Sequence, residues 1–210
     1  MQDTLIKIGA DPFPPYQYLD GSGNAAGSDY RHITEAMRRA GWRTETVIDA
    51  WGEILRRFEK KELDAVFQVQ DTPERLEKYF LSDLLREAET VFVTLDAALL
   101  ALESAQALPA RSLTLGVIAG FANGPAVDLL PESLKRFYPD TTSLLQGLEY
   151  GEVRLAVCDR GVMEYICEKE ACKPVPLIIP ALTFKRPLYV MFHDRALCDA
   201  YNRAQKGPAK

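Results

Sequence analysis

The chain has 210 residues, 47% of them hydrophobic, which is enough for one ordinary domain or two small lobes with real cores and excludes a disordered chain. Its 25 basic and 30 acidic residues give a formal charge of −5, and the basic residues occur singly or in pairs, so we expect no nucleic-acid partner. No apolar run approaches the roughly 20 residues that span a bilayer.

The N-terminus and the cysteines leave the cellular compartment open. The first residues, Met-Gln-Asp-Thr, do not form a targeting peptide, so the chain fits a cytosolic protein or one whose targeting segment was removed. Cys167 and Cys172 are close enough in sequence to be joined, although two separate thiols fit nearly as well. The spacing of these two with Cys158 and Cys198 matches neither a zinc site nor a redox motif, so we expect no metal and no cofactor.

The chain opens with a strand that leads into a stiff loop. The pattern predicts a strand over 5–9, and the adjacent Pro14 and Pro15 then force extended backbone. This loop carries Phe13 and Tyr16 away from the end of the strand, and glycines make the turns that follow.

A helix, a strand and a second helix come next. Ser28 and Asp29 are expected to cap a helix that ends at Gly41. A strand over 44–48 follows, and the apolar spacing predicts an amphipathic helix over 51–61.

The segment 64–75 joins a strand to a helix and carries an arginine at the junction. It reads as a strand containing Gln68 and Gln70 and then reaches a helix start at Pro73, a residue that suits the first helical position. Arg75 therefore lies in the first turn at the carboxyl end of a strand, which is the edge where ligands bind in α/β sheets. A guanidinium fork there matches a carboxylate, and two glutamines in an apolar strand suggest the lining of a cleft.

The second half of the chain repeats the same order. A strand over 89–94 and a short helix or connector over 95–111 separate the halves. We then expect strands over 113–118, 154–157, 175–179 and 187–192 and helices over 126–130, 142–149, 161–170 and 195–204. This alternation predicts an α/β protein with mostly parallel sheets flanked by helices.

In order and spacing, these features resemble the extracellular solute-binding proteins of the polar amino-acid type, which have the two-lobed type II periplasmic binding fold. The resemblance covers nearly the whole chain and is carried by Asp11-Pro12 with the Pro-Pro-aromatic loop, Gly27, Trp51, Leu63-Asp64-Ala65, Thr72-Pro73-Glu74-Arg75, Phe80-Leu81-Ser82-Asp83, and the segment from Gly151 to Asp159.

The resemblance implies roles for particular residues. Arg75 would bind the α-carboxylate of an amino acid and Asp159 its α-ammonium, with Phe13 packing on the ligand and Trp51 as a second wall. Asp11 and Tyr16 would lie near the side-chain end of the ligand. Gln68 and Gln70, inferred above to line the cleft, stand where the family usually has small hydroxyl residues or glycine.

Two departures from the family pattern concern the ligand. Gly120 is followed by Phe121 where a hydroxyl residue is common, so these two positions would offer only backbone N–H groups. The segment between Asp64 and Arg75 is about one residue shorter than in many amino-acid binders.

The resemblance also implies an organisation. Residues 1–93 and 188–210 would form lobe I and residues 94–187 lobe II, hinged near Thr94 and Pro187, with a ligand captured in the cleft between them as it closes. The protein would be a periplasmic monomer that delivers its solute to the membrane permease of an ABC transporter.

Other functions remain open from the sequence. The same fold serves as a sensor domain of membrane receptors, and some proteins of this fold resemble dehydratases, for which Asp159, Cys158 or His193 would be candidate acids. A pair of lobes that binds only a protein partner is a third alternative. We expect no enzyme, because the sequence contains no nucleophile–base pair, nucleotide loop or metal set.

Several candidate ligand-binding residues also have a possible purely structural role. Asp159 could simply cap the following helix, and Arg75 could pair with Glu74 or Asp71 at the surface. Phe13 and Trp51 could be ordinary packing residues, and Asp11 could brace the proline turn.

Overall fold

The computed structural model describes residues 4–121, 123–170 and 172–206. It divides into two compact units, unit 1 (Met1–Glu87 and Pro187–Lys210) and unit 2 (Ala88–Arg186). The chain passes between them within two strands, β7 (Arg86–Thr94) and β12 (Phe184–Phe192). The lobe boundaries expected from the sequence, 93/94 and 187/188, lie close to one end of β7 and inside β12.

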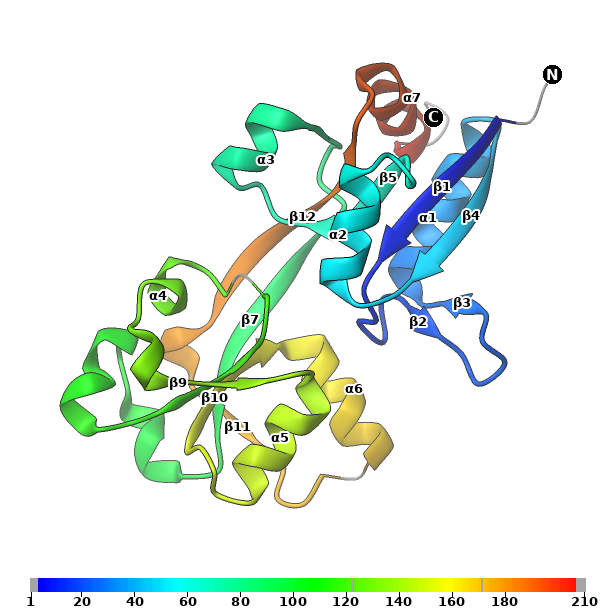
Figure 1. Ribbon diagram of the computed structural model, residues 1–210. Helices are drawn as coiled ribbons and strands as arrows, with labels where there is room; N and C mark the ends of the chain where they lie inside the picture. The colour runs from blue at the N-terminus through cyan, green and yellow to red at the C-terminus, as the bar shows by residue number, and fades with distance from the viewer. Residues whose placement is uncertain (1–3, 122, 171, 207–210) are drawn as a thin grey trace. The chain divides into compact units, whose positions relative to one another are not determined.

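Unit 1 is built on a sheet with the strand order β4-β1-β5-β12 (Figure 1). Its other strands are β1 (Thr4–Ala10), β4 (Trp42–Ile48), β5 (Ala65–Val69) and β6 (Phe80–Leu81), and β2 (Tyr18–Leu19) and β3 (Ala25–Ala26) form a separate hairpin. Strand β1 is parallel to β4 and β5, and β12 is antiparallel to β5 and β6. The strand antiparallel to β5 is thus β12, in which the chain re-enters unit 1 near its C-terminus.

Helices cover both faces of this sheet. Helices α1 (Ser28–Arg39) and α7 (Arg195–Gln205) pack on one face and α2 (Trp51–Glu59) on the other, whereas α3 (Pro73–Lys78) buries none of its residues. Alternate residues of β5 point to opposite faces. Phe67 accordingly shares a core with Met37 of α1 and Tyr201 of α7, whereas Val66 packs with Phe58 of α2.

The start of α1 corrects one prediction. Gly27, not Ser28 or Asp29, is the N-cap, and no side chain caps the helix. The backbone carbonyl of Tyr16 instead accepts hydrogen bonds from the N–H groups of Asp29 (2.9 Å) and Tyr30 (3.2 Å). Because the aromatic loop supplies the acceptors that the first helical N–H groups need, the Asp29 carboxylate is available for another partner.

Unit 2 has the strand order β7-β10-β8-β9, and β11 pairs with β7. Its strands besides β7 are β8 (Leu115–Ile118), β9 (Lys135–Tyr138), β10 (Leu155–Asp159) and β11 (Leu177–Ile178), and its helices are α4 (Pro125–Asp128), α5 (Thr141–Glu149) and α6 (Arg160–Glu170). Strand β8 is parallel to β9 and β10, whereas β7 is antiparallel to β10.

The predicted α/β class and most of the elements are confirmed. Strands β6 and β9 and the β2–β3 hairpin were not predicted, because each is short and lacks an alternating pattern. The connector over 95–111 is a run of 3₁₀ turns, η1 (Ala97–Ala101), η2 (Ala105–Ala107) and η3 (Pro109–Arg111), with η4 (Glu132–Leu134) and η5 (Pro180–Leu182) elsewhere in unit 2. Pro109 cannot continue a helix from the residues before it, and 3₁₀ helices are short in general, so this segment forms separate short turns.

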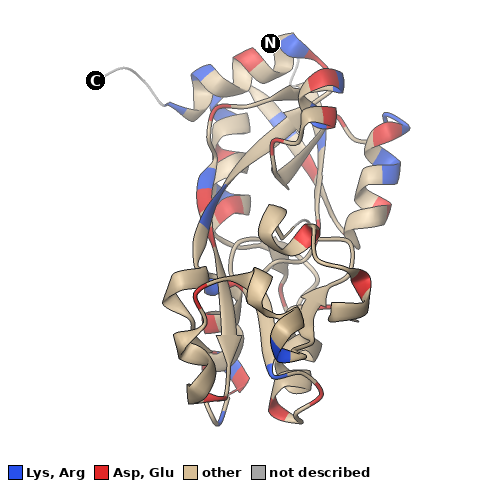
Figure 2. Ribbon diagram, turned by 90° about the vertical axis from the view of Figure 1, so that its left-hand side faces the viewer, with Lys and Arg blue, Asp and Glu red and all other residues tan. Residues whose placement is uncertain are grey.

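Basic and acidic residues are scattered over the ribbon, as the sequence pattern of single and paired basic residues indicated (Figure 2). Among the described residues, no helix has the length and apolar character needed to cross a membrane. The same residues contain no cluster of His, Cys, Asp and Glu that could hold a metal ion.

Candidate ligand-binding residues

Arg75 is a half-buried cation at the carboxyl end of β5. Thr72 caps α3 by accepting from the Arg75 backbone N–H at 3.4 Å, and Pro73 takes the first helical position as predicted. The guanidinium Nη1 donates to the carbonyl of Gln70 at 3.0 Å, and Cζ lies 5.8 Å from the centre of the Trp51 ring. These contacts orient the side chain without neutralising its charge.

The alternative in which Arg75 pairs with Glu74 or Asp71 at the surface is not observed. Glu74 binds Lys78 instead, at 2.8 Å, and no ion pair within the described residues involves Arg75. Burial lowers the pKa of Arg75, while the charge of Glu74 acts in the opposite direction. A partly desolvated guanidinium without a carboxylate is stabilised by an anion.

Asp11 is a buried carboxyl group where β1 ends. It is 9% exposed, and burial raises its pKa to about 7, against a smaller opposite effect of its own backbone N–H. No salt bridge in the described part of the chain includes Asp11. The ionised form of Asp11 is therefore unfavourable in the folded protein, and a cationic group next to it would stabilise that form.

The aromatic loop is packed and partly ordered by its own contacts. Phe13 is 9% exposed and its ring lies 6.0 Å from that of Tyr16, in a stacked arrangement. Tyr16 is half-buried, and the Arg86 guanidinium lies 3.5 Å above its ring. Both aromatic residues are in unit 1 together with Trp51, Asp11 and Arg75.

Gln68 lies in a buried polar network that the sequence did not reveal. Arg86 Nε donates to Asp29 Oδ2 at 2.6 Å, and Arg86 Nη2 donates to Gln68 Oε1 at 3.2 Å. Gln68 Nε2 donates to Asp29 Oδ2 and, at 3.0 Å, to Gln17 Oε1. The Gln68 side chain is thus engaged by protein groups, and Gln70 is half-buried two residues further on.

Arg86 and Asp29 are the residues that sequence reasoning missed. Their side chains are 16% and 10% exposed, so the ion pair is nearly buried. One signal was present: Arg86 is a charged residue at the start of β7, a strand whose last five residues are all buried, and a charge that is buried there needs a partner.

In unit 2, Asp159 is a fully buried carboxylate at the end of β10. Its Oδ1 accepts from the backbone N–H of Val162 at 3.2 Å, so Asp159 does cap the start of α6. Arg186 Nη2 lies 3.7 Å from Asp159 Oδ2, and these side chains are 13% and 1% exposed. Asp159 therefore has the helix-capping role considered in the sequence analysis. Its contact with a ligand ammonium stays a prediction.

Gly120 and Phe121 lie in a loop of unit 2. Gly120 is exposed and has a φ of 78°, a left-handed conformation suited to glycine. The Phe121 N–H reaches the Ile118 carbonyl at 3.4 Å, and α4 begins only at Pro125. The two residues therefore precede the helix rather than form its N-terminus.

Two groups considered for catalysis are held in structural contacts. Burial, reinforced by the Asp159 charge, raises the pKa of the Cys158 thiol far above its usual range. A ring nitrogen of His193 lies 2.7 Å from the Phe58 carbonyl, and the ring stacks on Phe58 at 3.8 Å. All four cysteines are free thiols in the structure.

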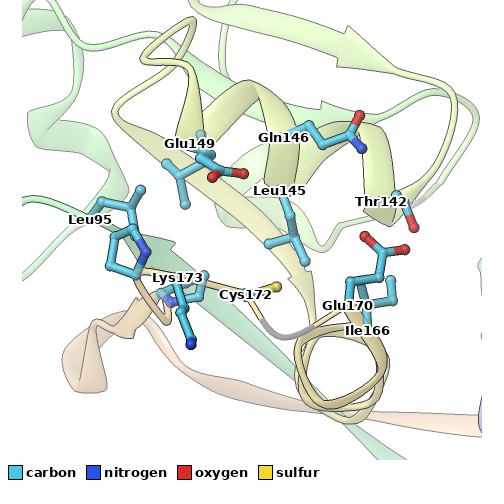
Figure 3. Close-up of a pocket in the computed structure, with 12 residues that line it drawn as sticks. Leu95, Thr142, Leu145, Gln146, Glu149, Ile166, Glu170, Cys172 and Lys173 are labelled. Atoms are coloured by element: carbon cyan, nitrogen blue, oxygen red, sulfur yellow. The ribbon is translucent and has the colours of Figure 1, made fainter.

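A small pocket in unit 2, about 30 Å³ in volume, is lined by Cys172 but by none of the candidate ligand-binding residues (Figure 3). It lies between α5, the end of α6 and the segment after Cys172, with Leu145 and Ile166 among its lining. Its size suits about one water molecule.

Comparisons with known proteins place the chain. The sequence profile of the bacterial extracellular solute-binding proteins, family 3, matches residues 6–206. No curated protein sequence matches the chain.

Among solved structures, an arginine-bound mutant of ArgBP from T. maritima is 19% identical, with a TM-score of 0.79 over 96% of this chain and 94% of that chain. The arginine-, lysine-, histidine-binding protein ArtJ from Geobacillus stearothermophilus is 20% identical, with a TM-score of 0.79 over 98% and 88% of the chains. AncCDT-1, an ancestral amino acid-binding protein described as a precursor of cyclohexadienyl dehydratase, is 20% identical, with a TM-score of 0.78 over 96% and 88%.

At these identities the likeness shows a shared fold. It confirms the type II periplasmic binding architecture that the sequence predicted. Because the family profile spans nearly the whole sequence, the chain belongs to the bacterial extracellular solute-binding proteins, family 3.

Proposed function

We propose that the protein is an amino-acid receptor of an ABC transporter, in which Arg75 binds the ligand α-carboxylate and Asp159 its α-ammonium. The observation that carries this proposal is the state of Arg75: half-buried, oriented by the Gln70 carbonyl and Trp51, and without an ion pair in the described part of the chain. An amino acid supplies the missing anion.

The energies are sufficient for such binding. Charge-assisted hydrogen bonds contribute about 1.5–3 kcal/mol each. Several of them, with packing on Phe13 and Trp51, can reach the roughly −8 kcal/mol of a micromolar complex after the costs of ordering.

Asp11 favours a ligand with a cationic side chain. A positive group would lower the high pKa of Asp11 and remove the cost of its buried charge. The names of two structural neighbours, which describe arginine, lysine and histidine binding, agree with this class of ligand. We therefore propose a basic amino acid as the first ligand to test, with Tyr16 near its side chain and Gln70, Gly120 and Phe121 as further contacts.

Calorimetric titration with a panel of amino acids tests the proposal. Arg75→Ala should weaken binding of every responding amino acid by at least about tenfold, because all of them share the α-carboxylate. Arg203→Ala, at an exposed arginine of α7, is the matched control and should bind as the wild type. Equal affinities for the Arg75→Ala variant and the wild type would exclude the carboxylate role.

We further propose that the receptor works in the periplasm as a monomer and delivers its ligand to a membrane permease, in keeping with its family. The sensor-domain alternative predicts fusion to a signalling module instead. Co-purification of the full-length protein with transporter subunits distinguishes the two.

The dehydratase alternative has one supporting observation, the likeness to AncCDT-1. Against it, the Cys158 thiol is buried with a raised pKa and His193 is bound to Phe58. We therefore propose a binding protein without catalysis. Turnover of a cyclohexadienyl acid by the purified protein would reverse this choice.

A further inference from the structure

Gln68 is the extra residue of a β-bulge in the strand that leads to Arg75. Strand β5 pairs with β12 through Phe67 with Val190 and through Val69 with Tyr189, and the register shifts between these pairs. Gln68 has no counterpart on β12, and its φ is 67°, a conformation that a residue with a side chain adopts only at a cost. Something must hold it there.

The polar network around Gln68 supplies that constraint. Both ends of the Gln68 amide are used: Oε1 accepts from Arg86, and Nε2 donates to Asp29 and Gln17. Arg86 is fixed in turn by its ion pair with Asp29 and by the Tyr16 ring 3.5 Å away. A nearly buried network of this kind tolerates few alternative arrangements.

The bulge sets the position of the segment that orients Arg75. The Gln70 carbonyl, two residues after Gln68, accepts from the Thr72 N–H at 3.1 Å and from Arg75 Nη1 at 3.0 Å. A shift of the backbone at Gln68 would therefore be transmitted to the guanidinium through Gln70. The same network holds Tyr16, so it reaches the aromatic loop as well.

We propose that Asp29, Arg86 and Gln68 form a positioning unit, in which buried polar contacts hold a strained bulge and thereby fix the geometry of the Arg75 guanidinium toward the ligand carboxylate. This inference rests on the proposed function of Arg75. None of the three residues needs to touch the ligand for the unit to act.

Gln68→Gly is the first test: glycine can still form the left-handed bulge, but without the side-chain contacts nothing confines the backbone to it. Affinity should fall about tenfold for all amino acids alike, since the shared carboxylate is the affected group. Lys61→Gly is the matched control: Lys61 is exposed, has a φ of 59°, and its replacement should leave affinity unchanged.

Arg86→Lys is the second test and stays informative if Gln68→Gly fails to fold. Lysine can keep the ion pair with Asp29 but cannot also donate to Gln68 with a fork, so Arg86→Lys should bind amino acids more weakly than the wild type. Where Gln68→Gly folds, Arg86→Lys should be the less affected of the two variants. Wild-type affinity in both variants would overturn the inference, and so would a changed ranking of ligands, which would indicate direct side-chain contact.

The outcome is separable from that of the proposed function. If Arg75→Ala loses binding while Gln68→Gly and Arg86→Lys bind as the wild type, the positioning unit is wrong and the receptor function stands. If Arg75→Ala binds normally, the proposed function itself fails.

Discussion

Arg186 lies 3.7 Å from the buried carboxylate of Asp159, so the residue proposed to bind a ligand ammonium already faces a resident cation of unit 2. The same carboxylate caps α6 through Val162. Asp159 therefore combines a structural role with its proposed ligand contact, and the two roles can be separated by substitution.

Asp159→Asn should weaken amino-acid binding by about tenfold or more, because the amide keeps an oxygen for the Val162 N–H but loses the negative charge. It should also destabilise the protein by about 1–3 kcal/mol, because Arg186 is left buried without this carboxylate. Calorimetry and urea unfolding measure the two effects.

The double variant Asp159→Asn with Arg186→Gln serves as its control. Removing both charges should restore most of the lost stability without restoring affinity. Recovery of affinity in the double variant would contradict the ammonium role of Asp159.

The buried carboxyl group of Asp11 predicts a pH dependence of stability. Its pKa is about 7 in the folded protein and 3.8 as the ordinary value, so the folded state binds more protons between these limits. The free energy of unfolding should therefore fall as pH rises from about 4 to 7, by as much as about 4 kcal/mol, and level off above.

Urea unfolding of the ligand-free protein at a series of pH values checks this. Asp11→Asn, which cannot ionise, should remove the decline and be more stable than the wild type at pH 8. A decline of equal size in Asp11→Asn would assign the effect to other groups.

Gly27 and Gly52 should respond oppositely to alanine. At Gly27 the φ is 119° and an added Cβ would lie 2.1 Å from the Tyr16 carbonyl oxygen, so Gly27→Ala should cost at least about 2 kcal/mol. Gly52 lies in α2 with open space around it, and Gly52→Ala should stabilise by about 0.5–1 kcal/mol. Thermal unfolding compares them; a harmless Gly27→Ala would mean that the loop can move away from α1.

The Cys158 thiol should be unreactive in the folded protein. It is 4% exposed and its pKa is raised by burial, so an alkylating reagent at pH 8 should modify it only after unfolding. Cys158→Ser should keep wild-type affinity for amino acids. Rapid native labelling, followed by peptide mass mapping, would show that the thiol is accessible after all.

Local signals explain what the sequence could predict. The start of α3 depends on Thr72 and Pro73, whose effects act within one turn, and the helix begins there. The position of Arg75 at the carboxyl end of β5 was also predictable, because the strand and the helix start were both visible in the sequence.

Contacts between distant residues explain what was missed. Asp29 and Arg86 are 57 positions apart, and nothing local to Asp29 distinguishes a helix cap from a buried ion pair. The left-handed conformation of Gln68 likewise depends on pairing with β12, a strand more than a hundred residues later. Burial and register are properties of the folded sheet, so a single sequence does not show them.

The discontinuous make-up of unit 1 has a consequence for synthesis on the ribosome. Unit 2 is one uninterrupted stretch of chain, whereas the core of unit 1 includes Val190, Phe192 and Tyr201, which are translated last. Unit 2 can therefore complete its core before unit 1 does. Until β12 and α7 have been translated, the N-terminal part of unit 1 exposes apolar residues that these two elements later cover. During that interval the exposed apolar residues of the segment 1–87 can be bound by chaperones that hold nascent chains.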